Sequence, residues 1–139
     1  MGIELFQTNR KRSIMDFKET QAIYLQIGEY VCEQILTGRW AEGERLLSVR
    51  EMGVALEVNP NTVMRTYDFL QNKEIIFNKR GVGYFVAEDA KNKITNYRKI
   101  QFLEQELPVL FKNMKLLGMN IEYLEKEYRD FIEKNTETE

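Results

Sequence analysis

The amino-acid sequence predicts a mainly α-helical protein with one small β-hairpin, followed by a second, wholly helical unit. Three observations support this fold class. Apolar residues recur every three or four positions over much of the chain, as in helices with one buried face. Two short β-rich runs flank a glycine-bearing loop, which is the pattern of a hairpin. The segment 89–139 carries a near-heptad apolar repeat, which is typical of helices that pack against other helices.

Composition excludes several classes of protein. The 139 residues include no histidine and one cysteine, which removes histidine-based catalysis, histidine-containing zinc sites and an intrachain disulfide. We therefore expect no enzyme activity, no metal and no cofactor, although a wholly carboxylate-based site stays open. No apolar run approaches the roughly 18 residues that a membrane span requires. We expect a cytoplasmic protein without a membrane partner.

The chain opens with a polar, basic segment at 1–14, which we interpret as a flexible arm because it lacks periodicity. A first helix is predicted over about 22–37, and Gly38 follows where helices commonly end with a left-handed residue. The apolar stripe of this helix is Tyr24, Ile27, Val31 and Ile35. Cys32 falls within the same helix, and we expect a small core side chain there rather than a redox sensor.

Two short helices are marked by their start signals. Ser48 and Glu51 form the Ser-x-x-Glu capping box of a helix over about 49–57. A third helix over about 60–72 begins with an Asn-Pro pair, which combines a capping side chain with proline at the first helical position. Only a tight turn separates these two helices, so they form a helix-turn-helix unit.

A hairpin is predicted next, from β-rich runs at 75–78 and 84–86 around a turn at 79–83. Its two glycines do not indicate a phosphate-binding loop, because no helix with a Lys-Ser/Thr pair follows them. Three helices followed by a hairpin form a winged helix-turn-helix domain, which we assign to residues 15–88.

Residues 89–139 are predicted to form a two-helix dimerisation domain. Its apolar seam comprises Ile100, Leu103, Leu107, Leu110, Met114, Leu117, Leu124 and Tyr128. The seam is too apolar for a lone exposed helix, so we expect pairing with a second copy across a two-fold axis. Pro108 lies inside the seam and either kinks the long helix or restarts it. Two helices cannot easily enclose a metabolite pocket, so we do not expect a small-molecule effector.

The exposed face of the third helix suits the DNA major groove. Val63, Tyr67 and Leu70 form its inner face, which leaves other positions exposed. Residue types that read base edges or contact a thymine methyl occupy this outer face, namely Asn61, Arg65 and Met64. Thr62 and the free amides of the first turn suit a phosphate, because helix N-termini carry partial positive charge.

Two other places complete the predicted DNA surface. Ser48 and Arg50 lie at the N-terminus of the preceding helix, where a phosphate is also favoured. Lys79, Arg80 and Gly81 form the hairpin tip, which offers two cations and a close backbone approach. Arg80 is the candidate for a minor-groove contact.

Several motifs, in the order in which they occur along the chain, resemble the N-terminal domain of the GntR family of bacterial transcription regulators. They lie at 23–27, 38–46, 48–51, 58–67 and 80–86. The resemblance implies a DNA surface that contains Arg50, Asn61, Thr62, Arg65, Arg80 and Gly81. The short helical C-terminal segment is similar to the YtrA branch of this family. The chain departs from the family pattern at Ala22 and Leu47, where proline is common, and at Glu74, where glycine is common.

The net charge of the whole chain argues against a DNA partner, whereas the net charge of one local segment favours a DNA partner. The chain has a net charge of −2, and residues 15–89 hold eight Lys and Arg against twelve Asp and Glu, a net −4. Residues 59–83 hold four cations against two carboxylates, a net +2. We expect a homodimeric repressor that binds a palindromic double-stranded operator with a shallow salt dependence. The alternative is a winged-helix protein-interaction module that binds no DNA.

Overall fold

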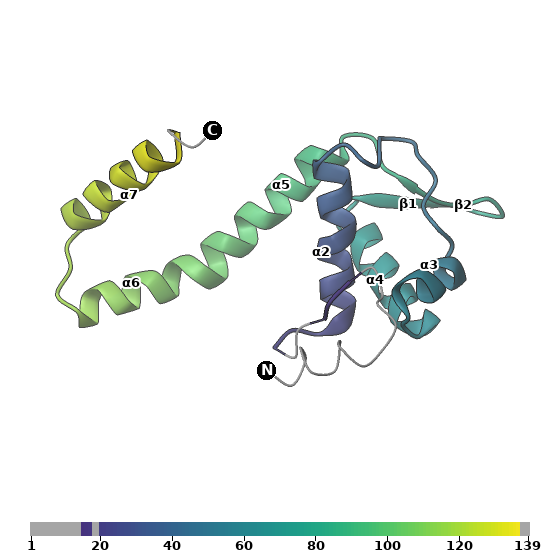
Figure 1. The fold of residues 1–139 in the computed structure, drawn as a ribbon, viewed down its shortest axis with the longest axis horizontal. Helices are drawn as coiled ribbons and strands as arrows, with labels where there is room; N and C mark the ends of the chain where they lie inside the picture. The colour runs from purple at the N-terminus through teal and green to yellow at the C-terminus, as the bar shows by residue number, and fades with distance from the viewer. Residues whose placement is uncertain (1–14, 18–19, 137–139) are drawn as a thin grey trace. The chain divides into compact units, whose positions relative to one another are not determined.

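The computed structural model describes residues 15–17 and 20–136, so the predicted arm at 1–14 lies outside the described residues. The chain divides into two compact units, Met1–Tyr97 and Arg98–Glu139. In chain order the elements are α2 Ile23–Leu36, α3 Val49–Leu56, α4 Pro60–Asn72, β1 Ile76–Lys79, β2 Gly83–Val86, α5 Ala90–Gln101, the π-helical turn η1 Phe102–Glu106, α6 Leu107–Leu116 and α7 Ile121–Thr136 (Figure 1). The predicted fold class, mainly α with one hairpin, is confirmed.

The capping side chains predicted from the sequence form hydrogen bonds at the starts of α3 and α4. In the capping box of α3, the Glu51 N–H donates to Ser48 Oγ at 3.1 Å and the Ser48 N–H donates to Glu51 Oε1 at 3.0 Å. The Asn61 N–H donates to Asn59 Oδ1 at 2.8 Å at the start of α4. These bonds satisfy amides that have no partner within the helix, which explains why the boundaries could be predicted.

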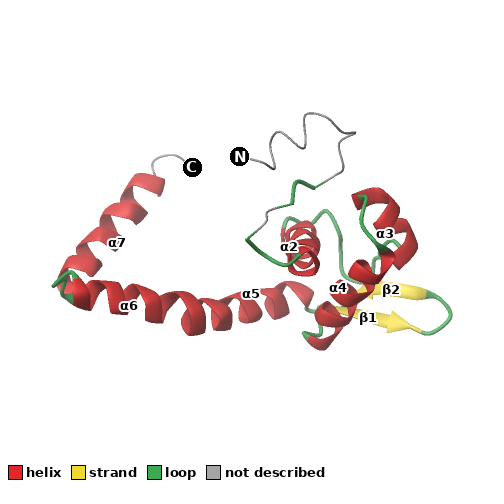
Figure 2. Ribbon diagram, turned by 90° about the horizontal axis from the view of Figure 1, so that it is seen from below, coloured by secondary structure: helices red, strands yellow, loops and turns green. Residues whose placement is uncertain are grey.

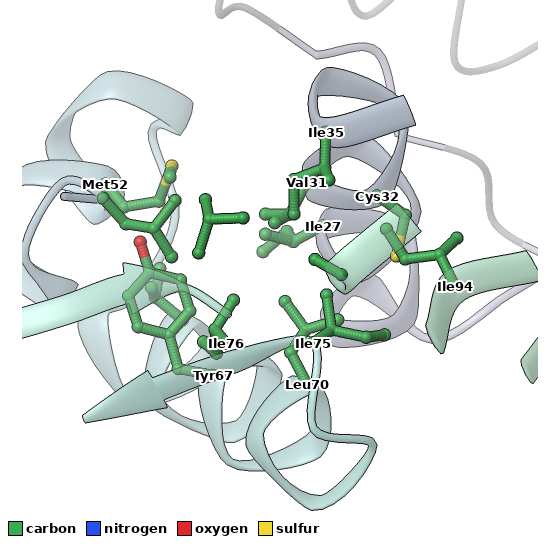
Figure 3. Packing of buried hydrophobic residues seen from close by; sticks show 14 of the residues in the cluster. Ile27, Val31, Cys32, Ile35, Met52, Tyr67, Leu70, Ile75, Ile76 and Ile94 are labelled. Carbon is green, nitrogen blue, oxygen red and sulfur yellow. The ribbon is translucent and has the colours of Figure 1, made fainter. Parts of the chain in front are cut away.

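The core of the first unit lies between α2, α3, α4 and the hairpin. Figure 3 shows Ile27, Val31 and Ile35 of α2 directed toward Met52 of α3 and Tyr67 of α4. All five side chains are at most 1% exposed. The start of α5 belongs to the same core through Ala90 and Ile94, so this unit extends past the hairpin to Tyr97. Cys32 is buried in this core, as predicted.

The wing consists of the β1–β2 hairpin and an added edge. The strands pair antiparallel in the register Ile76 with Val86. The segment before α3 lies along the other edge of β2, since the Leu46 N–H donates to the Tyr84 carbonyl at 2.8 Å and the Val86 N–H to the Glu44 carbonyl at 2.9 Å. These bonds hold the base of the wing to the chain that leads into α3. Figure 2 shows the hairpin extending past α3 and α4.

The helical path through Pro108 is continuous and contains a π-helical turn. A π-helical turn, Phe102–Glu106, follows α5, and its closing bond runs from the Leu107 N–H to the Phe102 carbonyl. Pro108 then lies in the first turn of α6, where its missing N–H is tolerated. The preceding residues Glu106 and Leu107 both have right-handed helical φ and ψ, so the structure accommodates Pro108 within a continuous helix and does not show a restart.

The second unit exposes most of its apolar side chains in the single chain. Met114 is the one buried seam residue, and Leu107 and Leu124 are half-buried. The other seam residues are 37–73% exposed, and they are Ile100, Leu103, Leu110, Leu117 and Tyr128. Asn120 caps α7 as predicted, by accepting the Tyr123 N–H at 3.0 Å. The described chain leaves an apolar surface on α6 and α7 without a cover.

Candidate nucleic-acid interface

The outer face of α4 presents the predicted base-reading side chains. Asn61, Met64 and Arg65 are exposed, while Val63, Tyr67 and Leu70 on the other face are fully buried. This division follows from the helical repeat, because positions three and four apart share a face. The α4 helix therefore offers a polar and methionine-bearing surface that its buried side chains hold in place.

The first turn of α4 differs from the expectation in one respect. The Asn61 N–H already donates to Asn59 Oδ1, and the Thr62 N–H donates to the Asn59 carbonyl at 2.9 Å. These two amides are therefore not free, because the Asn59 cap engages both. The half-buried Thr62 retains a side-chain hydroxyl at this position.

The start of α3 places Ser48 and Arg50 together. Ser48 caps the helix, and Arg50 is exposed one residue into it. The bonds from Ser48 lower the pKa of the Glu51 carboxyl, with a smaller contribution from the charge of Arg45. Arg50 forms no ion pair with any other residue that the structure describes. Its guanidinium is accordingly available to a partner.

The wing tip carries the other two predicted cations. Lys79 and Arg80 are exposed, and neither pairs with a carboxylate within the described ranges. The Val82 N–H donates to the Lys79 carbonyl at 2.9 Å, which closes the turn, and Gly81 has φ +78° there. A glycine suits this turn because L side chains rarely adopt a positive φ.

Tyr67 joins the three parts of the predicted surface. It lies on α4, its hydroxyl donates to the Leu47 carbonyl at 2.7 Å, and its ring packs edge to face on Tyr84 of β2 with centroids 4.8 Å apart. Leu47 immediately precedes the cap of α3, so one buried side chain fixes α3, α4 and the wing to one another. Burial raises the pKa of the Tyr67 hydroxyl well above the ordinary tyrosine value, and burial also raises the pKa of the Tyr84 hydroxyl.

Sequence reasoning missed two further features of this surface. Arg45 lies over Gly83 of the wing, where a Cβ atom would come within 3.0 Å of Arg45 Nε. The Tyr84 hydroxyl lies 3.7 Å from the Met64 sulfur, so the wing base contacts the outer face of α4. Both contacts join residues far apart in sequence, and no local pattern signals them.

The departures from the family pattern fall where backbone shape matters. Ala22 has φ −58° and ψ 137°, values that a proline also adopts. Glu74 has φ +61°, the left-handed conformation that favours glycine, and it pairs with Lys93 at 3.0 Å. Neither position is part of the predicted DNA surface.

Metal-binding clusters and membrane-spanning helices are not found in the described part of the chain. Residues 15–17 and 20–136 contain no group of three or more acidic or cysteine side chains placed to hold a metal ion. None of the helices described here is long and apolar enough to span a membrane. A helix-turn-helix with exposed polar side chains on its second helix, and a cationic wing beside it, defines the class of winged-helix DNA-binding proteins.

Comparison with known proteins identifies the family within this class. Residues 23–86 match the family model described as bacterial regulatory proteins, gntR family. The HTH-type transcriptional regulator YhcF of Bacillus subtilis is 34% identical over 117 residues, which cover 84% of this chain and 95% of YhcF. The HTH-type transcriptional repressor YtrA of the same organism is 32% identical over 110 residues, which cover 79% of this chain and 84% of YtrA.

Solved structures that are similar to this chain support the same family. A crystal structure assigned to the GntR family of transcriptional regulators, from Bacteroides thetaiotaomicron, is 47% identical with a TM-score of 0.74, covering 82% of this chain and 99% of its own. A GntR family regulator from Listeria monocytogenes is 36% identical with a TM-score of 0.64, covering 82% and 98%. The chain belongs to the GntR family of DNA-binding transcription regulators, and its relatives include the YtrA-like members. These relatives are named as transcriptional regulators.

Proposed function

We propose that the protein is a cytoplasmic, homodimeric repressor that recognises a specific palindromic operator. The observation that carries the proposal is the Tyr67 junction, which holds the start of α3, the exposed face of α4 and the wing in one arrangement. A rigid arrangement of three contact regions is what selective DNA binding needs, because phosphate contacts fix the register in which a helix reads the bases.

Each region has a role in this proposal. Asn61, Met64 and Arg65 of α4 enter the major groove and contact base edges. Phosphates are contacted from the first turns of α3 and α4 by Ser48, Arg50 and the hydroxyl of Thr62. The wing tip lies at the adjacent minor groove, where Arg80 enters the groove and Lys79 and the Gly81 backbone approach the sugar-phosphate edge.

The second unit supplies the dimer in this proposal. Apolar side chains on α6, at its C-cap and on α7 that are more than half exposed in the single chain include Val109, Leu117 and Tyr128. Among the residues of this unit that the structure describes, Met114 is the one buried side chain, and an exposed apolar surface of this kind is typical of an interface between subunits. A two-fold axis would place two α4 helices about 34 Å apart, or a multiple of that spacing, which matches a palindromic operator.

Repression is proposed from the relative YtrA, whose name describes a transcriptional repressor. The proposal needs no small-molecule effector. The small number of exposed cations on each protomer implies few phosphate contacts and a shallow salt dependence. A plot of log affinity against log salt should therefore have a slope no steeper than about −10.

A gel-shift titration on DNA from upstream of the protein's own gene tests this proposal. Wild-type protein is expected to shift that DNA in preference to a scrambled sequence, while Arg65→Ala and Arg80→Ala weaken the shift. Arg39→Ala is the matched control, because Arg39 is an exposed arginine of the same unit outside the proposed contacts. Equal behaviour of all four proteins on both sequences would contradict the proposal.

The second candidate is a winged-helix module that binds another protein. The net charge of −4 over residues 15–89, from eight cations against twelve carboxylates, favours this alternative, because most DNA-binding domains are basic. Co-purification of a stoichiometric partner protein, together with the absence of any DNA footprint, would favour it over the operator-binding proposal.

A further inference from the structure

Arg65 is stacked on an aromatic ring that belongs to another helix. Its guanidinium carbon Cζ lies 3.9 Å from the ring centroid of Tyr24 on α2. The Tyr24 ring packs edge to face on Phe69, with centroids 6.2 Å apart and planes at 80°. Phe69 packs in the same way on Tyr97, at 5.6 Å and 77°. The ring under Arg65 is therefore held by a row of aromatic side chains.

A hydrogen bond ties the same ring-bearing residue to α4. The Thr66 hydroxyl donates to the Tyr24 carbonyl at 2.7 Å, and Thr66 is fully buried. Thr66 directly follows Arg65 in the chain. The backbone of Tyr24 is thus attached to α4 beside the residue whose side chain its ring supports.

The contact with the Tyr24 ring leaves the N–H donors of the Arg65 guanidinium accessible to a partner. It occupies the flat face of the group, whereas the N–H donors point outward in its plane. Arg65 is exposed and forms no ion pair with another described residue. A side chain held in one orientation loses less conformational freedom on binding than an unheld arginine does.

We propose that Tyr24 is a positioning residue that holds Arg65 ready to donate two hydrogen bonds to the O6 and N7 atoms of a guanine. This inference rests on the proposed DNA-reading function of α4. Tyr24 itself touches no base. Its effect is on the strength and selectivity of the Arg65 contact, because a bidentate contact requires a fixed donor geometry.

The test measures binding of the full-length protein by fluorescence anisotropy to an operator selected from a random DNA pool. The guanine read by Arg65 is the position where Arg65→Ala no longer discriminates guanine from adenine. Tyr24→Leu is expected to reduce discrimination at that guanine by about two- to fivefold per protomer, or about four- to twenty-five-fold in a dimer with two such contacts. Tyr24→Phe keeps the ring and should retain the discrimination of the wild type.

Two further proteins separate positioning from a general structural role. Tyr30→Leu removes another α2 ring, which packs on Trp40 at 5.9 Å, and should leave discrimination unchanged. In the Arg65→Ala background, Tyr24→Leu should reduce operator affinity no further, because Tyr24 acts through Arg65.

Three results would overturn the inference. They are undiminished discrimination in Tyr24→Leu, additive losses of operator affinity in the double variant, or the absence of any guanine whose readout depends on Arg65. If the wild type selects no sequence at all, the proposed function fails as well, so the two failures are distinguishable.

Discussion

Replacing Tyr67 by phenylalanine isolates the hydrogen bond that joins α4 to the start of α3. The hydroxyl lies 2.7 Å from the Leu47 carbonyl oxygen, and the side chain is 0% exposed. Phenylalanine keeps the ring contact with Tyr84 but leaves the Leu47 carbonyl without this donor. We expect the free energy of unfolding at pH 7 to fall by about 1–2 kcal/mol. For a unit of this size, a loss of that order lowers Tm by about 5–10 °C.

Urea denaturation followed by circular dichroism measures this change. Operator affinity should also fall, because the start of α3 is held less firmly against α4. The salt dependence of binding should be unchanged, since the substitution removes no cation. A variant as stable as the wild type within about 0.3 kcal/mol would refute the importance of the Tyr67 junction, since the bond is then worth less than a typical buried hydrogen bond.

The same pair of proteins predicts a difference at alkaline pH. Burial raises the pKa of the Tyr67 hydroxyl in the folded state, whereas an unfolded tyrosine ionises near 10. The unfolded chain therefore loses this proton first, and the wild type loses stability as pH rises above 10. The stability gap between wild type and Tyr67→Phe should narrow by up to about 1.4 kcal/mol per pH unit there. An unchanged gap between pH 9 and 11 would show that the hydroxyl is not buried in solution.

Three other sets of substitutions test local features. The capping bonds lower the pKa of the Glu51 carboxyl in the folded protein. The ionised carboxyl therefore stabilises the fold above pH 4.5, its ordinary pKa, and this stabilisation is lost as the pH falls below that value. Glu51→Gln should accordingly lose less stability than the wild type between pH 6 and 3 in urea titrations. Glu74→Gly should raise the free energy of unfolding by about 1 kcal/mol through relief of its left-handed backbone, whereas Glu74→Gln, which keeps the backbone and loses the ion pair, should not. Leu103→Lys and Leu110→Lys should each weaken self-association at least about tenfold in sedimentation velocity, because a charge is costly in an apolar interface. Asn113→Lys, an exposed position of α6 outside the seam, is the control, and equal dissociation of all three would argue against the seam as the interface.

Features of the fold that depend on neighbouring residues could be predicted from the sequence. The capping box of Ser48 and the Asn-Pro start of α4 involve side chains within three residues of one another, so their spacing alone specifies the geometry. The buried and exposed faces of α4 follow from the helical repeat. For the same reason, the exposure of Asn61, Met64 and Arg65 was predictable.

Features that depend on the tertiary fold could not be predicted. The hydrogen bond from Tyr67 to Leu47 spans 20 residues, and the stack of Arg65 on Tyr24 joins two helices. Both depend on how helices pack, which no local pattern encodes. The π-helical turn before Pro108 likewise has no signal in the sequence, where the proline predicted either a kink or a restart.

The most direct test of the central claim is selection of bound sequences from a random DNA pool by the full-length protein, followed by a mass measurement of the selected complex. The proposal predicts one enriched motif with two-fold symmetry, half-sites about one helical turn or a multiple apart, and two protein chains on each duplex. Enrichment of no sequence, or of an asymmetric site bound by one chain, would contradict a dimeric operator-binding regulator.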